Sequence, residues 1–251
     1  MQRISTIVLT KNEEKNIERC LKSVVKFSDE LIVVDCYSDD DTVEIARRFT
    51  ENVYQNAWPG FSRQREYALS KTKNDWVLWI DADEEVSPGL ADEIAALDFS
   101  VDGYFLARLV HYLGAWIRHC GWYPDHTMRL FNKRKGRFSD SIVHETFKVQ
   151  GKTKRLDHPL FHYPYRDISH HLVKINSYAD LAALQMAKWG KKPSVSSALS
   201  HCLAKFFKMY LVKRGFLDGR RGLVISVLGS YYVFLKYIKH WEKTRIAATA
   251  R

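Results

Sequence analysis

Residues 76–85 have the sequence WVLWIDADEE. The five apolar residues, with polar residues before and after them, predict a short buried strand. Asp81 and Asp83 follow with D-x-D spacing, and side chains two positions apart in an extended chain point to the same side. We therefore expect them to converge at the carboxyl end of the strand, where open α/β sheets bind ligands. Two such carboxylates repel each other unless a cation or hydrogen bonds offset their charge. The alternative interpretation of the motif is an acidic turn before a helix.

Strand and helix patterns alternate four times over the first 100 residues. The predicted strands are 4–9, 30–35, 52–55 and 76–80, and the predicted helices lie within 12–27, 42–49, 62–70 and 88–97. This alternation predicts a parallel sheet with helices on both faces. Right-handed crossovers then place the strand ends at Thr10, Asp35 and Asp81 along one edge. Asn12 is in position to cap the first helix, with Glu13 in its first turn.

The sequence has no glycine-rich phosphate-binding loop of either common pattern. A nucleotide bound at the predicted edge would therefore need carboxylates for its base and ribose, and a metal ion for its phosphates.

Composition favours a globular chain in a reducing compartment. Hydrophobic residues make up 46% of the chain, enough for a substantial core. The four cysteines are scattered without a C-x-x-C pair, which argues against a zinc site or a disulfide framework. The first residues lead directly into a strand pattern rather than a signal peptide. We therefore expect a cytoplasmic location.

The positive charge is concentrated in the tail. Residues 1–200 contain 28 Lys and Arg against 27 Asp and Glu, whereas residues 201–251 contain 11 against 2. A nucleic-acid-binding domain would carry the positive charge on its main folded part, residues 1–200, which are nearly neutral. We therefore expect no nucleic-acid partner. The pattern instead indicates a neutral body with a basic anchor.

The tail is predicted to be helical and amphipathic. A helix pattern covers 169–189, a second covers 201–214, and residues 223–235 form an uncharged run followed by lysines. This run of thirteen residues is shorter than the ~20 that span a bilayer. An apolar face with a basic flank is typical of a helix at the membrane surface, and a helix docked on the body is the alternative.

The middle of the chain offers candidates for the rest of a site. Residues 111–127 are rich in aromatic residues, His and Gly, which fits either a sugar-binding surface or a packed irregular core. Asp125 follows Pro124, and His144-Glu145 ends a strand pattern.

Three motifs together resemble the inverting glycosyltransferases of family 2, which have the GT-A fold. They are STIVLTKNEE at residues 5–14, VVDCYSDDDT at 33–42 and WIDAD at 79–83. The second is close to the family pattern V-V-D-D-G-S-x-D-x-T, except that Cys36 replaces the second Asp. The segments GWYPD at 121–125, RLF at 129–131, VHE at 143–145 and KRGFLDG at 213–219 resemble the lipopolysaccharide-core branch, which includes heptosyl-I β-1,4-glucosyltransferases.

This resemblance implies a GT-A (Rossmann-like) α/β fold, with a mostly parallel central sheet, helices on both faces and an amphipathic helical tail. Residues 1–100 would be the nucleotide-sugar-binding half, 101–168 the acceptor-binding half and 169–251 the basic helical extension. The activity implied is inverting, metal-dependent transfer of a hexose, with glucose from UDP-glucose expected. The acceptor would be a sugar hydroxyl of a lipid-linked glycan, such as the lipopolysaccharide inner core, at the cytoplasmic face of the membrane.

The resemblance also implies roles for single residues. Asp83, with Asp81 and His144 as further candidates, would hold Mg²⁺ or Mn²⁺, which prefer oxygen ligands. Asp125 would be the catalytic base, and Arg129 fits the arginine that follows the base in the family. The residues expected to bind the donor are Thr10, Asn12, Glu13, Asp35, Arg65 and Asp81, with Asp35 accepting from uracil and Asp81 near the ribose.

Two other functions are compatible with parts of this sequence. A nucleotidyl- or phosphotransferase could also use the paired Asp residues, although the missing phosphate loop speaks against it. A non-enzymatic basic module that binds membrane or nucleic acid would need only the tail. The oligomeric state does not follow from the sequence.

Overall fold

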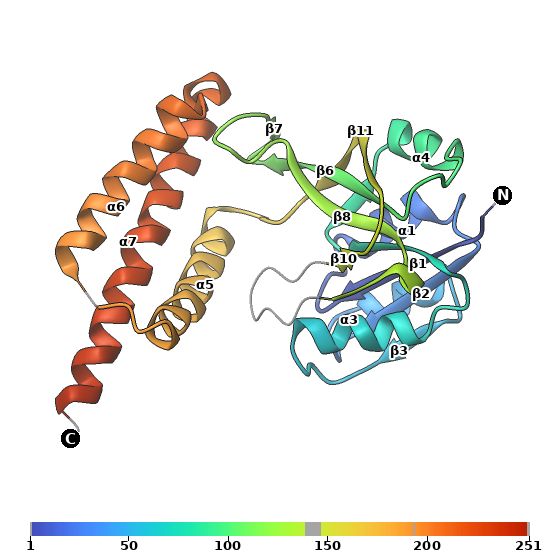
Figure 1. Cartoon of the computed structure of the whole chain (residues 1–251), viewed down its shortest axis with the longest axis horizontal. Helices are drawn as coiled ribbons and strands as arrows, with labels where there is room; N and C mark the ends of the chain where they lie inside the picture. Colours follow the sequence, from blue (N-terminus) through green and yellow to red (C-terminus); the bar gives the residue numbers. More distant parts are fainter. Residues whose placement is uncertain (1, 139–146, 193, 250–251) are drawn as a thin grey trace. The chain divides into compact units, whose positions relative to one another are not determined.

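The computed structural model describes residues 2–138, 147–192 and 194–249 of the chain (Figure 1). It contains two compact units. The first, which we call the sheet unit, comprises Met1–Leu109 and Pro124–Tyr163. The second, the helical unit, comprises Val110–Tyr123 and Pro164–Arg251.

The sheet unit begins with four parallel strands in the order β3-β2-β1-β4. They are β1 (Ile4–Thr10), β2 (Glu30–Asp35), β3 (Val53–Gln55) and β4 (Trp76–Asp81). The helices of this unit are α1 (Ile17–Val24), α2 (Thr42–Arg47), α3 (Phe61–Ser70) and α4 (Pro88–Ala95). The strands are almost continuously buried, as parallel strands covered on both faces must be.

Antiparallel strands extend the sheet beyond β4. In sheet order they are β8 (Asp125–Asn132), β6 (Gly103–Tyr112), β11 (Thr153–His162) and β5 (Glu84–Val86). A separate hairpin pairs β9 (Gly136–Phe138) with β10 (Phe147–Val149). The pairing of β5 with β11 matters for function, because it aligns His162 with Glu84 beside the D-x-D motif.

Successive strand residues alternate between two apolar layers. On one face, Val8, Val33 and Ile80 pack with buried residues of α1, α2 and α4. On the other face, Ile7, Val34 and Trp79 pack with α3 and the β9–β10 hairpin. The predicted α/β class, with helices on both faces and a helical C-terminal extension, is confirmed.

The start of the first helix differs from the prediction. Asn12 does not cap α1, whose N-cap is Asn16, and Glu13 therefore lies before the helix. Asn12 has φ of 55°. Its side-chain Oδ1 accepts from the Asp39 amide at 2.9 Å, and its own amide donates to Ser38 Oγ at 2.8 Å. These bonds to the loop after β2 compete with helix formation, and Asn tolerates the left-handed conformation better than most residues.

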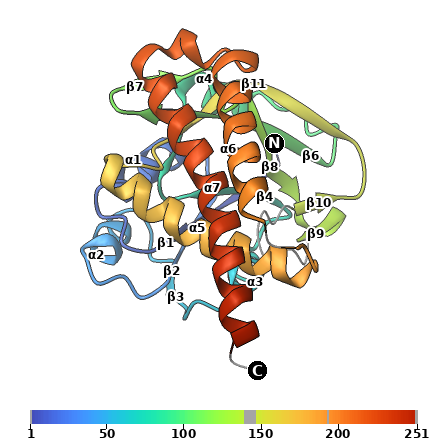
Figure 2. The ribbon, with the colours of Figure 1, turned by 90° about the vertical axis from the view of Figure 1, so that its left-hand side faces the viewer.

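The helical unit contains three long helices, which Figure 2 shows side by side. They are α5 (Ile168–Lys188), α6 (Val195–Phe207) and α7 (Gly219–Thr249). Between α6 and α7 lie a π-helical turn, η2 (Lys208–Val212), and a 3-10 turn, η3 (Gly215–Asp218). This unit also holds β7 (Ala115–Ile117), which pairs with β6.

The last helix is longer than the sequence pattern indicated. The uncharged thirteen-residue run lies inside a single helix of 31 residues. Among the described residues, one helix, over Gly215–Arg245, has the length and apolar composition that could cross a membrane.

Part of the aromatic region forms a packed core in the helical unit. Tyr112 and Trp122 pack against Tyr165 and His171, with ring centroids 5.4–6.2 Å apart. The Tyr112 hydroxyl lies 2.9 Å from His171 Nδ1. For these residues the structure favours the packed-core interpretation over a sugar-binding surface.

Burial of His171 predicts a loss of stability in mild acid. Burial, with the nearby Lys174 charge, lowers the pKa of His171 to about 4 from an ordinary value of 6.5. The unfolded chain therefore binds more protons below pH 6.5, and stability falls as the pH falls from there towards 4. We expect this residue to lower the free energy of unfolding by about 2 kcal/mol between pH 7 and pH 5.

Urea unfolding at the two pH values measures this effect. His171→Gln keeps a hydrogen-bond acceptor for Tyr112 but does not titrate in this range. We expect the variant to lose about 2 kcal/mol less than the wild type on acidification. Equal losses in the two proteins would contradict the prediction.

Candidate active site

The strand register brings three of the predicted site residues together. Thr10 lies opposite Asp35 in the β1–β2 ladder, and Leu9 lies opposite Asp81 in the β1–β4 ladder. The ends of strands β1, β2 and β4 therefore line one edge, which confirms the expectation from right-handed crossovers. This edge is the carboxyl end of the parallel strands, the usual ligand side of an α/β sheet.

Asp35 is a fully buried carboxylate held by its own loop. It accepts hydrogen bonds from the Ser38 amide at 2.8 Å, from the Ser38 hydroxyl and from Gln55 Nε2 at 3.3 Å. The next residue, Cys36, accepts from Gln64 Nε2 at 3.1 Å. Burial, with the Asp35 charge, raises the pKa of the Cys36 thiol. Cys36 is therefore neutral at physiological pH and does not supply the negative charge of the Asp that it replaces.

Thr10 contributes a buried polar atom without a protein partner. Its Oγ1 makes no hydrogen bond within the described ranges, while its carbonyl accepts from the Cys36 amide at 3.0 Å. Buried hydroxyls normally find a partner, so this one is available to a ligand or a water molecule. Glu13, three residues further along, is held in place because its amide donates to Thr42 Oγ1 at 2.8 Å and its carboxylate accepts from Asn16.

Asp81 forms an ion pair with the buried Arg129, a residue that the sequence indicated only through the family resemblance. Arg129 on β8 donates from Nη2 to Asp81 Oδ2 at 2.9 Å and to Glu84 Oε1 at 2.5 Å. Glu84 in turn accepts from the Asp81 amide at 2.9 Å. Burial raises the pKa of Glu84 despite the Arg129 charge. This triad fixes the start of the D-x-D turn.

Two guanidinium groups flank Trp79 and act on Asp81. Arg65 on α3 lies over the Trp79 ring at 3.8 Å, and Arg129 lies 4.5 Å from the same ring. The Trp79 indole donates to Asp81 Oδ1 at 3.3 Å. Burial opposes ionisation of Asp81, but the charges of Arg129 and Arg65 outweigh it and hold the pKa of this carboxyl well below its ordinary value. Asp81 is therefore an anion whose two oxygens are both engaged.

Asp83 has a different neighbour, His162, at the end of β11. Asp83 Oδ2 lies 3.5 Å from His162 Nε2, and both side chains are largely buried. The Tyr163 amide donates to the Asp83 carbonyl at 2.8 Å, which fixes the two segments to each other. His162 Nδ1 is buried and makes no hydrogen bond in the part of the chain that the structure describes. The pair offers one oxygen and one nitrogen ligand.

His162 was not predicted from the sequence as a site residue. It lies in a strand whose pattern alternates poorly and contains Pro159, so no strand was predicted there. The signal that could have found it is the histidine at the end of that segment, but only long-range pairing with β5 brings it to Asp83. The predicted metal ligand His144 lies outside the described residues. Within those residues, no cluster of three or more potential ligands is present.

Asp125 opens β8 and faces Arg108 on β6. Arg108 donates from Nε at 3.0 Å and also from Nη2, both to Asp125 Oδ2. Arg108 Nη1 also lies 3.9 Å from Glu84 Oε1. Arg108 thus links Asp125, through Glu84 and Arg129, to Asp81. Asp125 is half-buried, and Oδ1 receives no hydrogen bond from the residues described.

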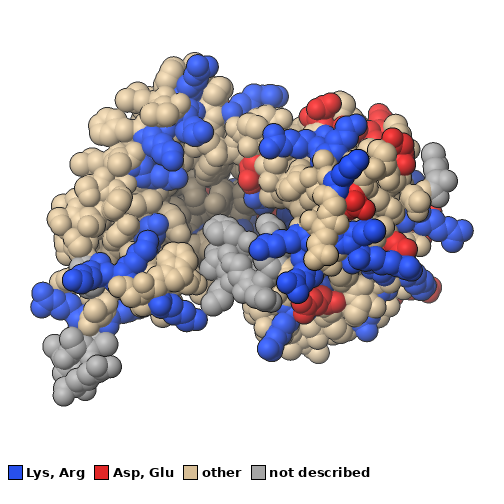
Figure 3. Space-filling view, in the orientation of Figure 1, with Lys and Arg blue, Asp and Glu red and all other residues tan. Residues whose placement is uncertain are grey.

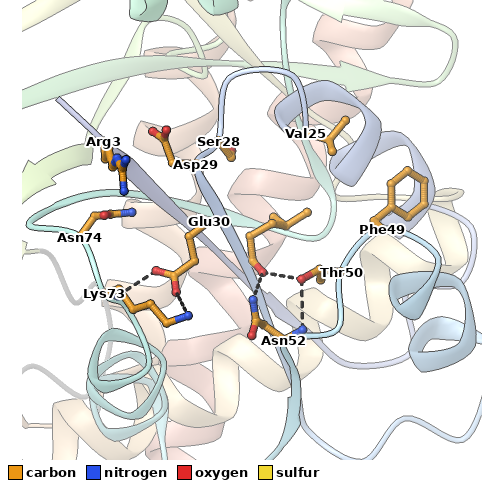
Figure 4. A pocket seen from close by; sticks show the side chains of 11 residues that line it. Arg3, Val25, Ser28, Asp29, Glu30, Phe49, Thr50, Asn52, Lys73 and Asn74 are labelled. Carbon is orange, nitrogen blue, oxygen red and sulfur yellow. Dashed lines mark hydrogen bonds and ion pairs between the residues drawn. The ribbon is translucent and has the colours of Figure 1, made fainter. Parts of the chain in front are cut away.

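A cavity of about 420 Å³ lies elsewhere and belongs to a different edge (Figure 4). It is lined by Arg3, Glu30 and Asn74 among others, at the amino ends of β1, β2 and β4. Lys73 and Glu30 form an ion pair across it at 3.8 Å. This position excludes it from the D-x-D site, which lies at the carboxyl ends.

Several known proteins similar to this chain are named glycosyltransferases. Over 95% of the chain, it is 34% identical to an uncharacterised glycosyltransferase of Rickettsia typhi, of which it covers 87%. It is 24% identical to the lipopolysaccharide core biosynthesis glycosyltransferase LpsC of Rhizobium meliloti, over 98% of the chain and 94% of that protein. Among solved structures, the chain matches the glucosyl-3-phosphoglycerate synthase of Mycobacterium tuberculosis in complex with Mn²⁺ and UDP-glucose. The match covers 44% of each of the two chains, at 24% identity and a TM-score of 0.36.

A family model and the 34% identical relative together show the family of this chain. The model for glycosyl transferase family 2 matches residues 5–149, which include the D-x-D turn, Asp125 and the strands that position them. Relatives at 34% identity extend the match through the helical unit. The chain is therefore an enzyme that belongs to glycosyl transferase family 2.

Proposed function

We propose that this enzyme transfers a hexose, with inversion, from a UDP-sugar to a hydroxyl of a lipid-linked glycan. Glucose is the expected hexose and the lipopolysaccharide inner core the expected acceptor. The observation that carries the proposal is the Asp83–His162 pair beside the ion-paired Asp81, at the ligand edge of the parallel strands. Similarity to LpsC over nearly the whole chain supports the lipopolysaccharide class of acceptor.

The donor would lie along the ends of β1, β2 and β4. Asp35 has carboxylate oxygens that would accept from the uracil imide. The Thr10 hydroxyl, which has no partner among the described residues, lies beside it in register. Asp81 would accept from the ribose, since its charge is already offset by Arg129. Asn12 and Glu13 order the loop that closes the nucleoside end. Arg65, fixed over Trp79, would face the diphosphate.

Asp83 and His162 fit a divalent cation. Mg²⁺ and Mn²⁺ are commonly bound by one or two protein side chains, with substrate phosphates and water completing the shell. The buried Nδ1 of His162 has no protein partner among the described residues, which leaves the imidazole able to present Nε2 towards Asp83. When bound, the cation would offset the negative charge that develops on the leaving diphosphate.

Asp125 is the proposed base. Its Oδ2 is fixed by Arg108, while Oδ1 remains able to accept the proton of the acceptor hydroxyl. Inversion requires the hydroxyl to attack from the face opposite the leaving diphosphate. Asp125 opens β8 and Asp83 lies in the turn between β4 and β5, and these strands belong to one sheet, so the sheet sets the relation between base and leaving group.

The basic helical unit is proposed to hold the enzyme at the cytoplasmic membrane surface. Figure 3 shows Lys and Arg side chains among the uncharged surface of this unit. Residues 201–251 contain 11 Lys and Arg against 2 Asp and Glu, which favours contact with anionic lipid and with a phosphorylated glycolipid. Residues 1–100 would serve the donor and 101–168 the acceptor, with His162 of the second segment added to the donor's cation site.

A panel of nucleotide sugars tests the proposal. The purified enzyme is incubated with Mn²⁺ or Mg²⁺ and each UDP-hexose, with and without a glycolipid extract, and UDP is quantified. We expect metal-dependent release of UDP, fastest with UDP-glucose and increased by the extract. No UDP from any donor would contradict the proposal, and release of pyrophosphate would favour a nucleotidyltransferase.

Asp125→Asn tests the assignment of the base. Asparagine keeps an acceptor oxygen for Arg108 but cannot take a proton, so we expect kcat to fall by at least about a hundredfold. The KM for UDP-glucose should change little, because Asp125 is assigned no contact with the donor. Asp92→Asn, at an exposed position on α4, is the matched control and should be unchanged. Near-normal turnover of Asp125→Asn would remove Asp125 as the base.

A further inference from the structure

The turn between α6 and α7 presents large apolar side chains to solvent. Four of them, Leu211, Val212, Phe216 and Leu217, have 47–72% of their surface exposed. We call these four residues the apolar elbow. They lie within seven consecutive positions on η2 and η3. Contiguous apolar patches on soluble proteins commonly mark a binding surface for a protein or a membrane.

The elbow is fixed from the inside, so this exposure belongs to an ordered structure. Asp218 accepts hydrogen bonds from the backbone amides of Arg118 at 3.3 Å and His119 at 2.9 Å. Gly215 packs so closely that an added Cβ would lie 2.8 Å from Cys120 Sγ. The Cys120 amide donates to the Lys213 carbonyl at 3.0 Å. These contacts hold η2 and η3 while their apolar side chains point outward.

Cationic residues flank the elbow in the sequence and also lie between its apolar residues. They are Lys205, Lys208, Lys213, Arg214, Arg220 and Arg221. Between residues 201 and 222 the one acidic residue is Asp218, and its carboxylate is engaged by the contacts just described. Apolar side chains flanked by Lys and Arg match the interface of an anionic bilayer, where the chains enter the acyl boundary and the cations meet lipid phosphates.

The part of α7 beyond residue 223 is less suited to contact with a membrane than its sequence indicated. Lys239 and Lys243 both form ion pairs with Asp180 on α5, Lys243 at 3.0 Å. Ile225 and Val233 of the uncharged run are buried. These two lysines and two apolar residues are therefore used within the helical unit, while Leu223, Val227 and Tyr231 of the run keep 42–47% of their surface exposed. The elbow side chains have higher exposure, 47–72%, and six cationic residues nearby in the sequence.

We propose that the apolar elbow inserts into the interfacial region of an anionic bilayer and is the membrane-anchoring point of the enzyme. This deepens the membrane association proposed above and is independent of the donor and acceptor. A second copy of the chain fits this surface less well than a bilayer. Two elbows facing each other would bring together the six cationic residues of each copy, which repel.

Vesicle flotation with paired variants tests the elbow. The elbow variant is Val212→Glu with Leu217→Glu, at positions 72% and 56% exposed. The control is Val173→Glu with Leu184→Glu on α5, at positions 64% and 49% exposed, which adds the same charge. On vesicles of phosphatidylcholine with phosphatidylglycerol, we expect the elbow variant to bind at least about tenfold more weakly than the wild type, and the control within about twofold.

The remaining outcomes separate the alternatives. Wild-type binding should fall on pure phosphatidylcholine vesicles and in high salt. Equal binding by the two variants, or no binding by the wild type, would overturn the proposal. So would a wild-type dimer in analytical ultracentrifugation that the elbow variant dissociates, or resistance of the wild type to alkaline carbonate extraction from membranes, which indicates a spanning helix. Flotation needs no turnover, so an inactive enzyme that still floats would refute the proposed donor chemistry and leave the elbow intact.

Discussion

Asp83→Asn is expected to lower kcat/KM for UDP-glucose by about a thousandfold or more, while the protein stays folded. Asparagine has nearly the same shape but loses the charge that would bind the cation opposite His162. Asp83 faces His162 at 3.5 Å, and the ion pairs with Arg129 are made by Asp81 and Glu84, so the substitution keeps those two ion pairs. Initial rates of UDP release over a series of Mn²⁺ concentrations measure the effect.

Two comparisons make this result specific. His162→Ala should also weaken the dependence on Mn²⁺, because it removes the second proposed ligand. Asp92→Asn changes an exposed carboxylate on α4 and should keep wild-type rates. If Asp83→Asn retains more than about a tenth of wild-type kcat/KM with an unchanged Mn²⁺ dependence, Asp83 does not hold the metal.

Arg129→Met is expected to lower the free energy of unfolding by about 3–5 kcal/mol. Arg129 is 3% exposed and supplies the positive charge between Asp81 and Glu84. Its loss leaves two neighbouring carboxylates without compensation, one of them fully buried, and removal of one partner from a buried ion pair costs more than the pair itself contributes. Urea unfolding followed by circular dichroism measures the change.

The double variant Arg129→Met with Glu84→Gln distinguishes charge from packing. Glutamine keeps an oxygen for the Asp81 amide but carries no charge, so stability should recover by more than about 1 kcal/mol. Arg155→Met, at an exposed position of β11, should change stability by less than about 0.5 kcal/mol. A loss in Arg129→Met as small as that of Arg155→Met would show that the triad does not hold this turn.

The parallel half of the sheet could be predicted because its signals are local. Strands β1, β2 and β4 are short apolar runs, and right-handed crossovers then determine which ends meet. Thr10, Asp35 and Asp81 follow from that rule alone. Asn12 did not, because its hydrogen bonds go to a loop 27 residues away rather than to the helix that follows it.

The rest of the site depends on pairings that no local pattern shows. Strand β5 has three residues and β11 is largely exposed, yet their ladder brings His162 to Asp83. Arg108 and Glu84 join the site because antiparallel strands extend the sheet past β4. In the tail, the predicted segments 201–214 and 223–235 leave Gly222 between them, but it lies inside α7, where a Cβ would lie 1.8 Å from the Gly215 carbonyl oxygen. It permits close packing rather than ending a helix.

The central claim is that this edge of the sheet binds a UDP-sugar together with a divalent cation held by Asp83. Calorimetric titration of UDP into the full-length protein tests it most directly. We predict that Mn²⁺ strengthens UDP binding by at least about tenfold in the wild type, and that Asp83→Asn abolishes this gain without preventing weak metal-free binding. Equal UDP affinity with and without Mn²⁺, or the same Mn²⁺ effect in Asp83→Asn, would contradict the claim.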